Sequence, residues 1–136
     1  MSDAFQLRIV APTRQLLDEE VNEVTAPGTA GEFGVLPQHT TFLSSLEIGT
    51  LSFRSDKTTR RIAIRGGFAE VSNDVMTVLA EAAQFSDEIN TVKAQEDLLA
   101  ANVRLTELDP TDDDYSVADA DRRWAEIRLA TAGAKP

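Results

Sequence analysis

The sequence predicts a β plus α fold: an antiparallel β-sandwich or flattened barrel over residues 1–86, followed by an antiparallel two-helix hairpin over residues 87–136. Three observations predict it. Short apolar runs up to about Phe85 alternate with polar residues at every second position, the period of half-buried strands. After Ser86 the chain is rich in Ala and Leu over two helix-length segments. A short acidic loop containing Pro110 joins these segments, which favours antiparallel helices.

The first strand is predicted from Phe5, Leu7 and Ile9, which alternate with polar neighbours. Pro12 ends this strand because a proline has no N–H to donate to the next strand. Residues 21–25 form a second candidate strand, although their apolar spacing is imperfect. Several short strands at such spacing indicate a sandwich or barrel rather than alternating strands and helices.

The third and fourth strands are predicted around residues 50–54 and 61–65, each with regular alternation. Ser55-Asp56-Lys57 lies between them and has the composition of a turn. Gly66-Gly67 follows the fourth strand and predicts a bulge or a close approach of two backbones.

The last two strands are predicted over residues 68–71 and 75–80, on either side of the candidate hairpin turn Ser72-Asn73-Asp74. Residues 75–80 are apolar on both faces. This pattern is typical of a strand that is buried at the centre of a sheet.

The first helix is predicted over residues 89–108. Ser86 is a good N-cap, and Asp87 and Glu88 place negative charge where the helix dipole favours it. Pro110 then ends the helix. Its larger apolar residues fall on one face: Ile89, Val92, Leu99 and Val103.

The second helix is predicted to begin at Ser116, which forms a capping-box-like pair with Asp119. Its apolar residues follow a 3-4-3-4 spacing, a narrow stripe that suits packing on another helix. These residues are Val117, Ala120, Trp124, Ile127 and Thr131. We interpret Trp124 as a packing residue rather than as a surface for a nucleotide base.

Composition excludes several classes of function. The chain has 23 acidic and 13 basic side chains, a net charge of -10, which would repel nucleic acid. It has no cysteine and a single histidine, His39, so we expect no disulfide, no thiolate chemistry and no metal centre. No phosphate-binding loop or activated nucleophile motif is present, and we expect neither enzymatic activity nor a cofactor. No apolar run is long enough to span a bilayer, so we expect no direct membrane insertion.

Glycines gather at one place: Gly28, Gly31 and Gly34 lie within seven residues. Such density predicts tight turns that need a positive φ, around an exposed loop tip that carries Glu32 and Phe33.

Two motifs give the sequence a specific resemblance. Residues 31–39, Gly-Glu-Phe-Gly-Val-Leu-Pro-Gln-His, resemble a signature of the epsilon subunits of bacterial F-type ATP synthases, although Gln38 stands where that family usually has glycine. Residues 66–71, Gly-Gly-Phe-Ala-Glu-Val, resemble its second signature together with residues 75–80. The resemblance covers essentially the whole chain.

The resemblance implies a non-catalytic rotor protein that couples a catalytic head to a c-ring. Its partners would be the gamma subunit, the c-ring and the alpha and beta catalytic subunits, at the cytoplasmic face of a bacterial inner membrane. Glu32 and Phe33 match the loop that faces the c-ring, and His39 matches a position near gamma. The hairpin is implied to regulate ATP hydrolysis, and the candidates for an inhibitory contact with the beta subunit are Arg122, Arg123 and Arg128.

Some relatives bind ATP through an Ile-Asp-x-x-Arg-Ala motif on the first helix. The matching residues here are Ile89, Asn90, Lys93 and Ala94. Since Asn replaces the carboxylate and Lys replaces the planar guanidinium, we expect no strong ATP binding.

An alternative is a β-sandwich adaptor that self-associates through its helical tail. The two hypotheses differ in solution, because a rotor subunit should be monomeric when isolated and should join a complex with gamma.

Overall fold

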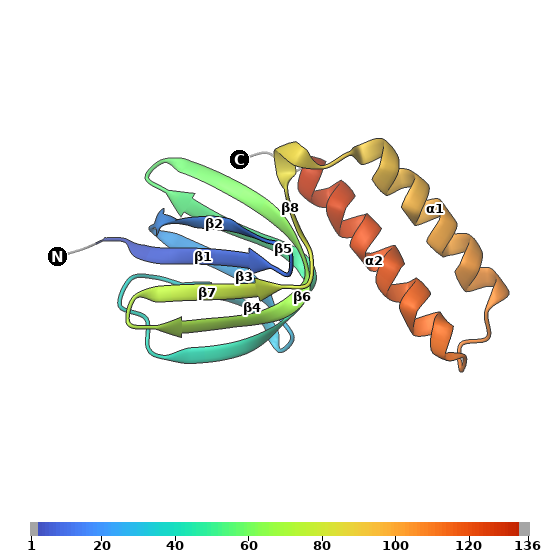
Figure 1. Cartoon of the computed structure of the whole chain (residues 1–136), viewed down its shortest axis with the longest axis horizontal. Coiled ribbons are helices and arrows are strands. Elements are labelled where there is room, and N and C mark those ends of the chain that lie inside the picture. The colour runs from blue at the N-terminus through green and yellow to red at the C-terminus, as the bar shows by residue number, and fades with distance from the viewer. Residues whose placement is uncertain (1–2, 134–136) are drawn as a thin grey trace.

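The structure is a computed structural model that describes residues 3–133 and contains a strand-rich body with a helical hairpin at one side (Figure 1). The strands are β1 (Phe5–Ala11), β2 (Arg14–Val21), β3 (Glu23–Gly28), β4 (Gly31–Val35), β5 (Phe42–Ser55), β6 (Thr58–Ser72), β7 (Val75–Ala80) and β8 (Ala83–Phe85). The helical elements are the 3₁₀ turn η1 (Ser86–Glu88) and the helices α1 (Thr91–Glu107) and α2 (Asp113–Gly133).

The eight strands form one unclosed sheet that folds over into a sandwich (Figure 1). Their order is β2-β1-β7-β6-β5-β3-β4, and β8 pairs with β6. The pairings are antiparallel except that β1 runs parallel to β7. The predicted sandwich followed by two helices is therefore confirmed, with a parallel pair that local alternation did not predict.

Strand β6 contributes to two parts of the sheet because two glycines lie at its middle. Residues 62–64 pair with β8, whereas residues 67–72 pair with β7. Gly67 has a φ of 128°, and a Cβ there would lie 1.9 Å from the carbonyl oxygen of Leu79. This confirms the predicted close approach of two backbones.

Both predicted hairpin turns are confirmed. Asn73 and Asp74, with φ values of 53° and 59°, join β6 to β7. Asp56, with a φ of 58°, and Lys57 join β5 to β6. Asn and Asp tolerate this left-handed conformation better than most residues, which explains why they stand in two-residue loops.

Two strand predictions need correction. Residues 21–25 are not one strand, because Asn22 separates the end of β2 from the start of β3. Residues 68–71 are the second half of the continuous strand β6. Strand β2 escaped prediction because its sequence, RQLLDEEV, is mostly polar and buries only Leu17 and Val21.

The helix boundaries also differ from the prediction. Ser86 begins η1 and does not cap a helix; the cap of α1 is Asn90, whose side chain accepts a hydrogen bond from the Lys93 backbone N–H at 3.0 Å. Helix α2 begins at Asp113, and the Ser116 hydroxyl donates to the Asp113 carbonyl at 2.9 Å. Ser116 therefore lies inside the first turn rather than at its cap.

The hairpin lies on the sandwich through α2. Helix α2 packs against β5 and β6, whereas α1 packs mainly against α2 (Figure 1). Helix α1 turns its small residues Ala94 and Ala101 inward. Its predicted apolar stripe points outward instead, with Val92 63%, Leu99 68% and Val103 47% exposed.

Candidate functional site

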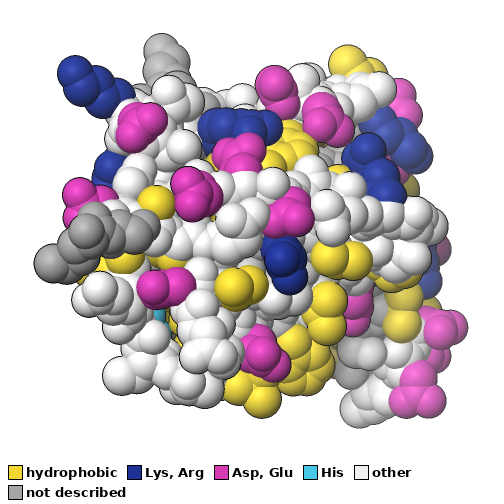
Figure 2. All heavy atoms as spheres, turned by 60° about the vertical axis from the view of Figure 1, so that its left-hand side comes forward, with side chains coloured by type: hydrophobic (Ala, Val, Ile, Leu, Met, Phe, Trp, Pro, Cys, Tyr) yellow, Lys and Arg dark blue, Asp and Glu magenta, His cyan; other side chains and the backbone are white. Residues whose placement is uncertain are grey.

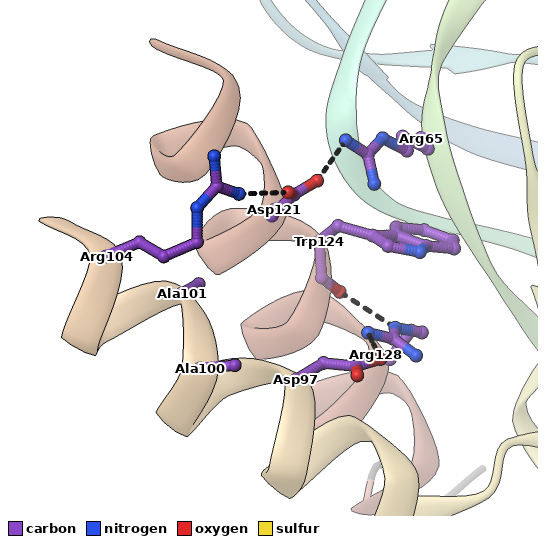
Figure 3. A pocket seen from close by; sticks show the side chains of 8 residues that line it. All are labelled: Arg65, Asp97, Ala100, Ala101, Arg104, Asp121, Trp124 and Arg128. Atoms are coloured by element: carbon purple, nitrogen blue, oxygen red, sulfur yellow. Dashed lines mark hydrogen bonds and ion pairs between the residues drawn. The ribbon is translucent and has the colours of Figure 1, made fainter. Parts of the chain in front are cut away.

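A pocket of about 290 Å³ lies where the two helices meet strand β6 (Figure 3). Three arginines and two aspartates reach it from different elements. Its lining residues are Arg65, Asp97, Ala100, Ala101, Arg104, Asp121, Trp124 and Arg128. None of the four residues of the degenerate ATP motif lines it.

Asp121 of α2 is shared by two arginines. Arg65 Nη2, from β6, donates to its Oδ1 at 2.7 Å, and Arg104 Nη1, from α1, lies 3.5 Å from its Oδ2. Both arginines thus pair with one carboxylate, so neither Arg65 nor Arg104 brings an unpaired positive charge to the pocket.

Arg128 is an internal residue of the hairpin and only 7% exposed. Its Nη2 donates to Asp97 Oδ2 at 2.9 Å, and its guanidinium lies 5.4 Å from the centre of the Trp124 ring. A hydrogen bond from Lys93, and then one from Arg128, lower the pKa of Asp97 from its ordinary value. Asp97 therefore stays ionised and holds Arg128 between the helices.

Arg122 and Arg123 are also compensated by carboxylates. Arg122 lies 2.7 Å from Asp119 and 2.5 Å from Glu126, both on α2. The hydrogen bond to Asp119 raises the pKa of Arg122. Arg123 lies 3.5 Å from Asp119 and 3.5 Å from Glu47 of β5. In this arrangement the three arginines named from sequence all have partners within the chain.

Glu32 and Phe33 lie in the edge strand β4, not on a loop tip. The turn ends earlier than expected because Gly28 pairs with Gly31 and closes a two-residue loop. Adjacent strand residues point to opposite faces. Glu32 is accordingly exposed, whereas Phe33 packs against the core and meets Phe42 edge-to-face at 5.0 Å.

His39 lies in the loop between β4 and β5, close to the same aromatic residue. Its ring meets Phe42 edge-to-face at 5.9 Å, and its Nδ1 lies 2.7 Å from the Thr40 carbonyl oxygen. A carbonyl only accepts, so Nδ1 is the donor. The structure thus brings His39 and Phe33 together around Phe42.

The residues of the degenerate ATP motif have structural roles. Asn90 caps α1, Lys93 Nζ pairs with Asp97 at 2.7 Å, and Ala94 is fully buried. Ile89 is the residue that ends η1. These contacts account for the motif positions without a nucleotide.

Sequence reasoning missed an exposed apolar patch on the sandwich, made of Leu43, Phe68 and Leu79. These residues are 68%, 56% and 54% exposed and line one hollow of about 150 Å³ together with Glu70 and Thr77. Strand pairing places Phe68 opposite Leu79 and Leu43 opposite Glu70 on one face. The prediction that residues 75–80 are buried on both faces was wrong for Leu79, since no described element covers it.

Figure 2 shows how charge is distributed on one face of the molecule. On the face shown in Figure 2, acidic and basic side chains are intermingled, and hydrophobic side chains lie between them. Neither described helix combines the length and the apolarity that crossing a bilayer requires. Within residues 3–133, no three potential ligands among His, Cys, Asp and Glu converge on a metal-sized site.

Comparison with known proteins gives a consistent match. Residues 4–86 match the family model described as "ATP synthase, Delta/Epsilon chain, beta-sandwich domain". The chain is 42% identical over 133 residues to the ATP synthase epsilon chain of Geobacter sp. (strain M21), covering 98% of this chain and 96% of that one. It is 43% identical over 133 residues to the epsilon chain of Trichlorobacter lovleyi, with the same coverage.

The fold also matches a solved structure. A chain from the cryo-EM structure of the Euglena gracilis mitochondrial ATP synthase, with OSCP, F1 and c-ring, superposes with a TM-score of 0.81 at 22% identity. The match covers 96% of this chain and 82% of that one. At this identity the likeness supports the shared fold.

Proposed function

Because the chain belongs to the family of ATP synthase epsilon chains, we propose that it is a non-catalytic rotor subunit of the central stalk of a bacterial F-type ATP synthase. It would join the gamma subunit and the c-ring to the catalytic alpha and beta subunits. Its place would be the cytoplasmic face of the inner membrane, where it is held through the complex. It would need neither a cofactor nor an active site of its own.

The observation that carries this proposal is the uncovered apolar patch. Leu43, Phe68 and Leu79 are each more than half exposed on one face of the sandwich. Burying a side chain of this size is worth about 1.5–3 kcal/mol, so a chain gains from covering three of them. We assign this patch to the gamma subunit, with His39 as a further contact.

The c-ring contact is assigned to the open edge of the sheet at β4. Glu32 is exposed there, and Phe33 behind it packs on Phe42 and fixes the strand. A carboxylate on a braced edge strand can pair with basic groups of the ring and transmit torque. Glu32 would make the contact, and Phe33 would support it.

The hairpin is proposed to act as a brake on ATP hydrolysis through Arg122, Arg123 and Arg128. In the folded-down arrangement Arg123 pairs with Glu47 of the sandwich, and Arg128 is buried between the helices. Contact with an acidic surface of a beta subunit would thus require the hairpin to leave the sandwich and Arg128 to exchange its internal partner.

The patch assignment is tested by binding of the full chain to a complex of alpha, beta and gamma from the same bacterium. Phe68→Glu is expected to weaken binding at least about tenfold, because it puts a charge into a surface that must be dehydrated. Leu99→Glu, on the equally exposed stripe of α1, is the matched control and should leave the affinity unchanged. Equal affinities of the native chain and Phe68→Glu would remove the patch from the interface.

A further inference from the structure

One carboxylate joins three elements where the hairpin faces the sandwich. Asp121 belongs to α2, Arg65 comes from β6 of the sandwich, and Arg104 comes from α1 (Figure 3). The N–O distances are 2.7 Å to Arg65 and 3.5 Å to Arg104. We name Asp121, Arg65 and Arg104 the Asp121 cluster. Its central charge acts both between the helices and between the hairpin and the sandwich.

Two further polar contacts join the hairpin to the sandwich. Thr131 Oγ1 lies 2.8 Å from Thr50 Oγ1, and Arg123 Nη1 lies 3.5 Å from Glu47 Oε2. Trp124 is the one large apolar side chain that α2 buries, and its ring points away from α1 toward the sandwich (Figure 3). Because Trp124 is the only large apolar side chain that α2 buries, we expect the ion pairs to contribute to docking beside it.

Other contacts join the two helices of the hairpin directly. Arg128 bonds to Asp97 between the helices at 2.9 Å. Ala94 and Ala101 of α1 are buried, as are Ala118 and Ala125 of α2, so the helices approach closely. These contacts do not involve the sandwich.

We propose that the charge of Asp121 keeps the hairpin docked, and that its removal or screening lets the hairpin leave the sandwich as a closed pair of helices. Only the consequence of this proposal rests on the proposed function: undocking takes Glu47 away from Arg123, which then keeps Asp119 alone and can turn to an acidic partner. Docking itself is a property of the isolated chain.

The test uses a thiol as a reporter of undocking in the full-length chain, which has no native cysteine. Thr131→Cys puts the thiol at a fully buried position that faces Thr50 of the sandwich. Its rate of reaction with a thiol reagent measures the undocked fraction, even when that fraction is small. Asp121→Asn in this background is expected to raise the rate about fivefold. Circular dichroism should show unchanged helix content.

Controls separate undocking from other changes. Asp114→Asn removes an exposed charge of the same helix and should not alter the rate. Arg65→Gln removes the sandwich partner and should raise the rate as Asp121→Asn does, which keeps the test valid if one variant folds poorly. Raising the salt from about 20 mM to about 500 mM should accelerate the Thr131→Cys chain but not its Asp121→Asn derivative.

A second thiol, Val78→Cys in the sandwich core, reports global unfolding. The proposal is overturned if Asp121→Asn and Arg65→Gln leave the Thr131→Cys rate unchanged, or if they accelerate Val78→Cys equally. No catalytic subunit is needed, so these outcomes are independent of whether the chain binds gamma.

Discussion

At the scale of single residues, Gln38 stands where the family motif usually has glycine, and its backbone adopts a conformation that glycine favours. Its φ is 64°, in the left-handed region where a side chain costs about 1–2 kcal/mol and glycine costs little. The backbone N–H of Gln38 donates to Asp74 Oδ1 at 2.6 Å, which helps to hold this conformation. The resemblance to a motif with glycine at this position thus has a backbone reason.

We predict that Gln38→Gly raises the free energy of unfolding by about 0.5–1 kcal/mol, measured by urea denaturation. The relief of the left-handed conformation exceeds the added entropy of glycine in the unfolded chain. Gln38→Ala keeps the backbone cost and should change stability by less than about 0.5 kcal/mol. A destabilised Gln38→Gly chain would contradict this explanation.

Partners of charged residues could not be predicted at this scale. The sequence identified Arg122, Arg123 and Arg128 as candidate cations on an acidic chain. It did not indicate that Arg128 would be buried beside Asp97, 31 residues earlier, because that contact depends on how the helices are rotated against each other. Helix rotation is set by packing, not by the order of charges.

At the scale of elements, β6 depends on glycine at its centre. Gly67 and Gly31 have nearly the same φ, 128° and 127°, but their surroundings differ. A Cβ at Gly67 would lie 1.9 Å from the Leu79 carbonyl oxygen, whereas nothing lies within 4 Å of a Cβ at Gly31. Substitutions at Gly31 therefore measure the cost of a side chain at positive φ alone, and substitutions at Gly67 add the cost of a steric clash with β7.

We predict that Gly31→Ala lowers the free energy of unfolding by about 1–2 kcal/mol and that Gly67→Ala lowers it by at least about 3 kcal/mol. Only Gly67→Ala forces the backbones of β6 and β7 apart. Chemical denaturation of both variants measures the difference. Equal losses would mean that the approach of the two strands contributes nothing to the requirement for glycine.

Elements were predicted more reliably than their faces. Alternation found β1, β5, β6 and β7, and composition found both helices. The apolar stripe of α1 was wrong as a packing face, because close contact with α2 selects the alanines and leaves Leu99 exposed. Apolar residues on both faces of residues 75–80 likewise predicted that Leu79 would be buried, but its side chain is 54% exposed. An apolar pattern alone does not distinguish a buried face from an exposed apolar one.

At the scale of the whole molecule, the fold has a sandwich with its own core and a hairpin that lies on it through α2. Every member of the main core cluster lies between Phe5 and Phe85. The architecture and the family could be predicted from sequence, because two glycine-rich motifs and the change from strands to helices are local signals. The docked position of the hairpin could not be predicted, since it depends on long-range pairs such as Arg65 with Asp121.

The most direct test of the rotor assignment is ATP hydrolysis by a complex of alpha, beta and gamma from the same bacterium. Full-length chain and a chain that ends at Ser86 are added separately, and binding to the complex is measured in parallel. We predict that both forms bind and that only the full-length chain slows hydrolysis. If both bind and neither slows hydrolysis, the hairpin is not a brake. If neither form binds, the chain is not the rotor subunit proposed for this family member.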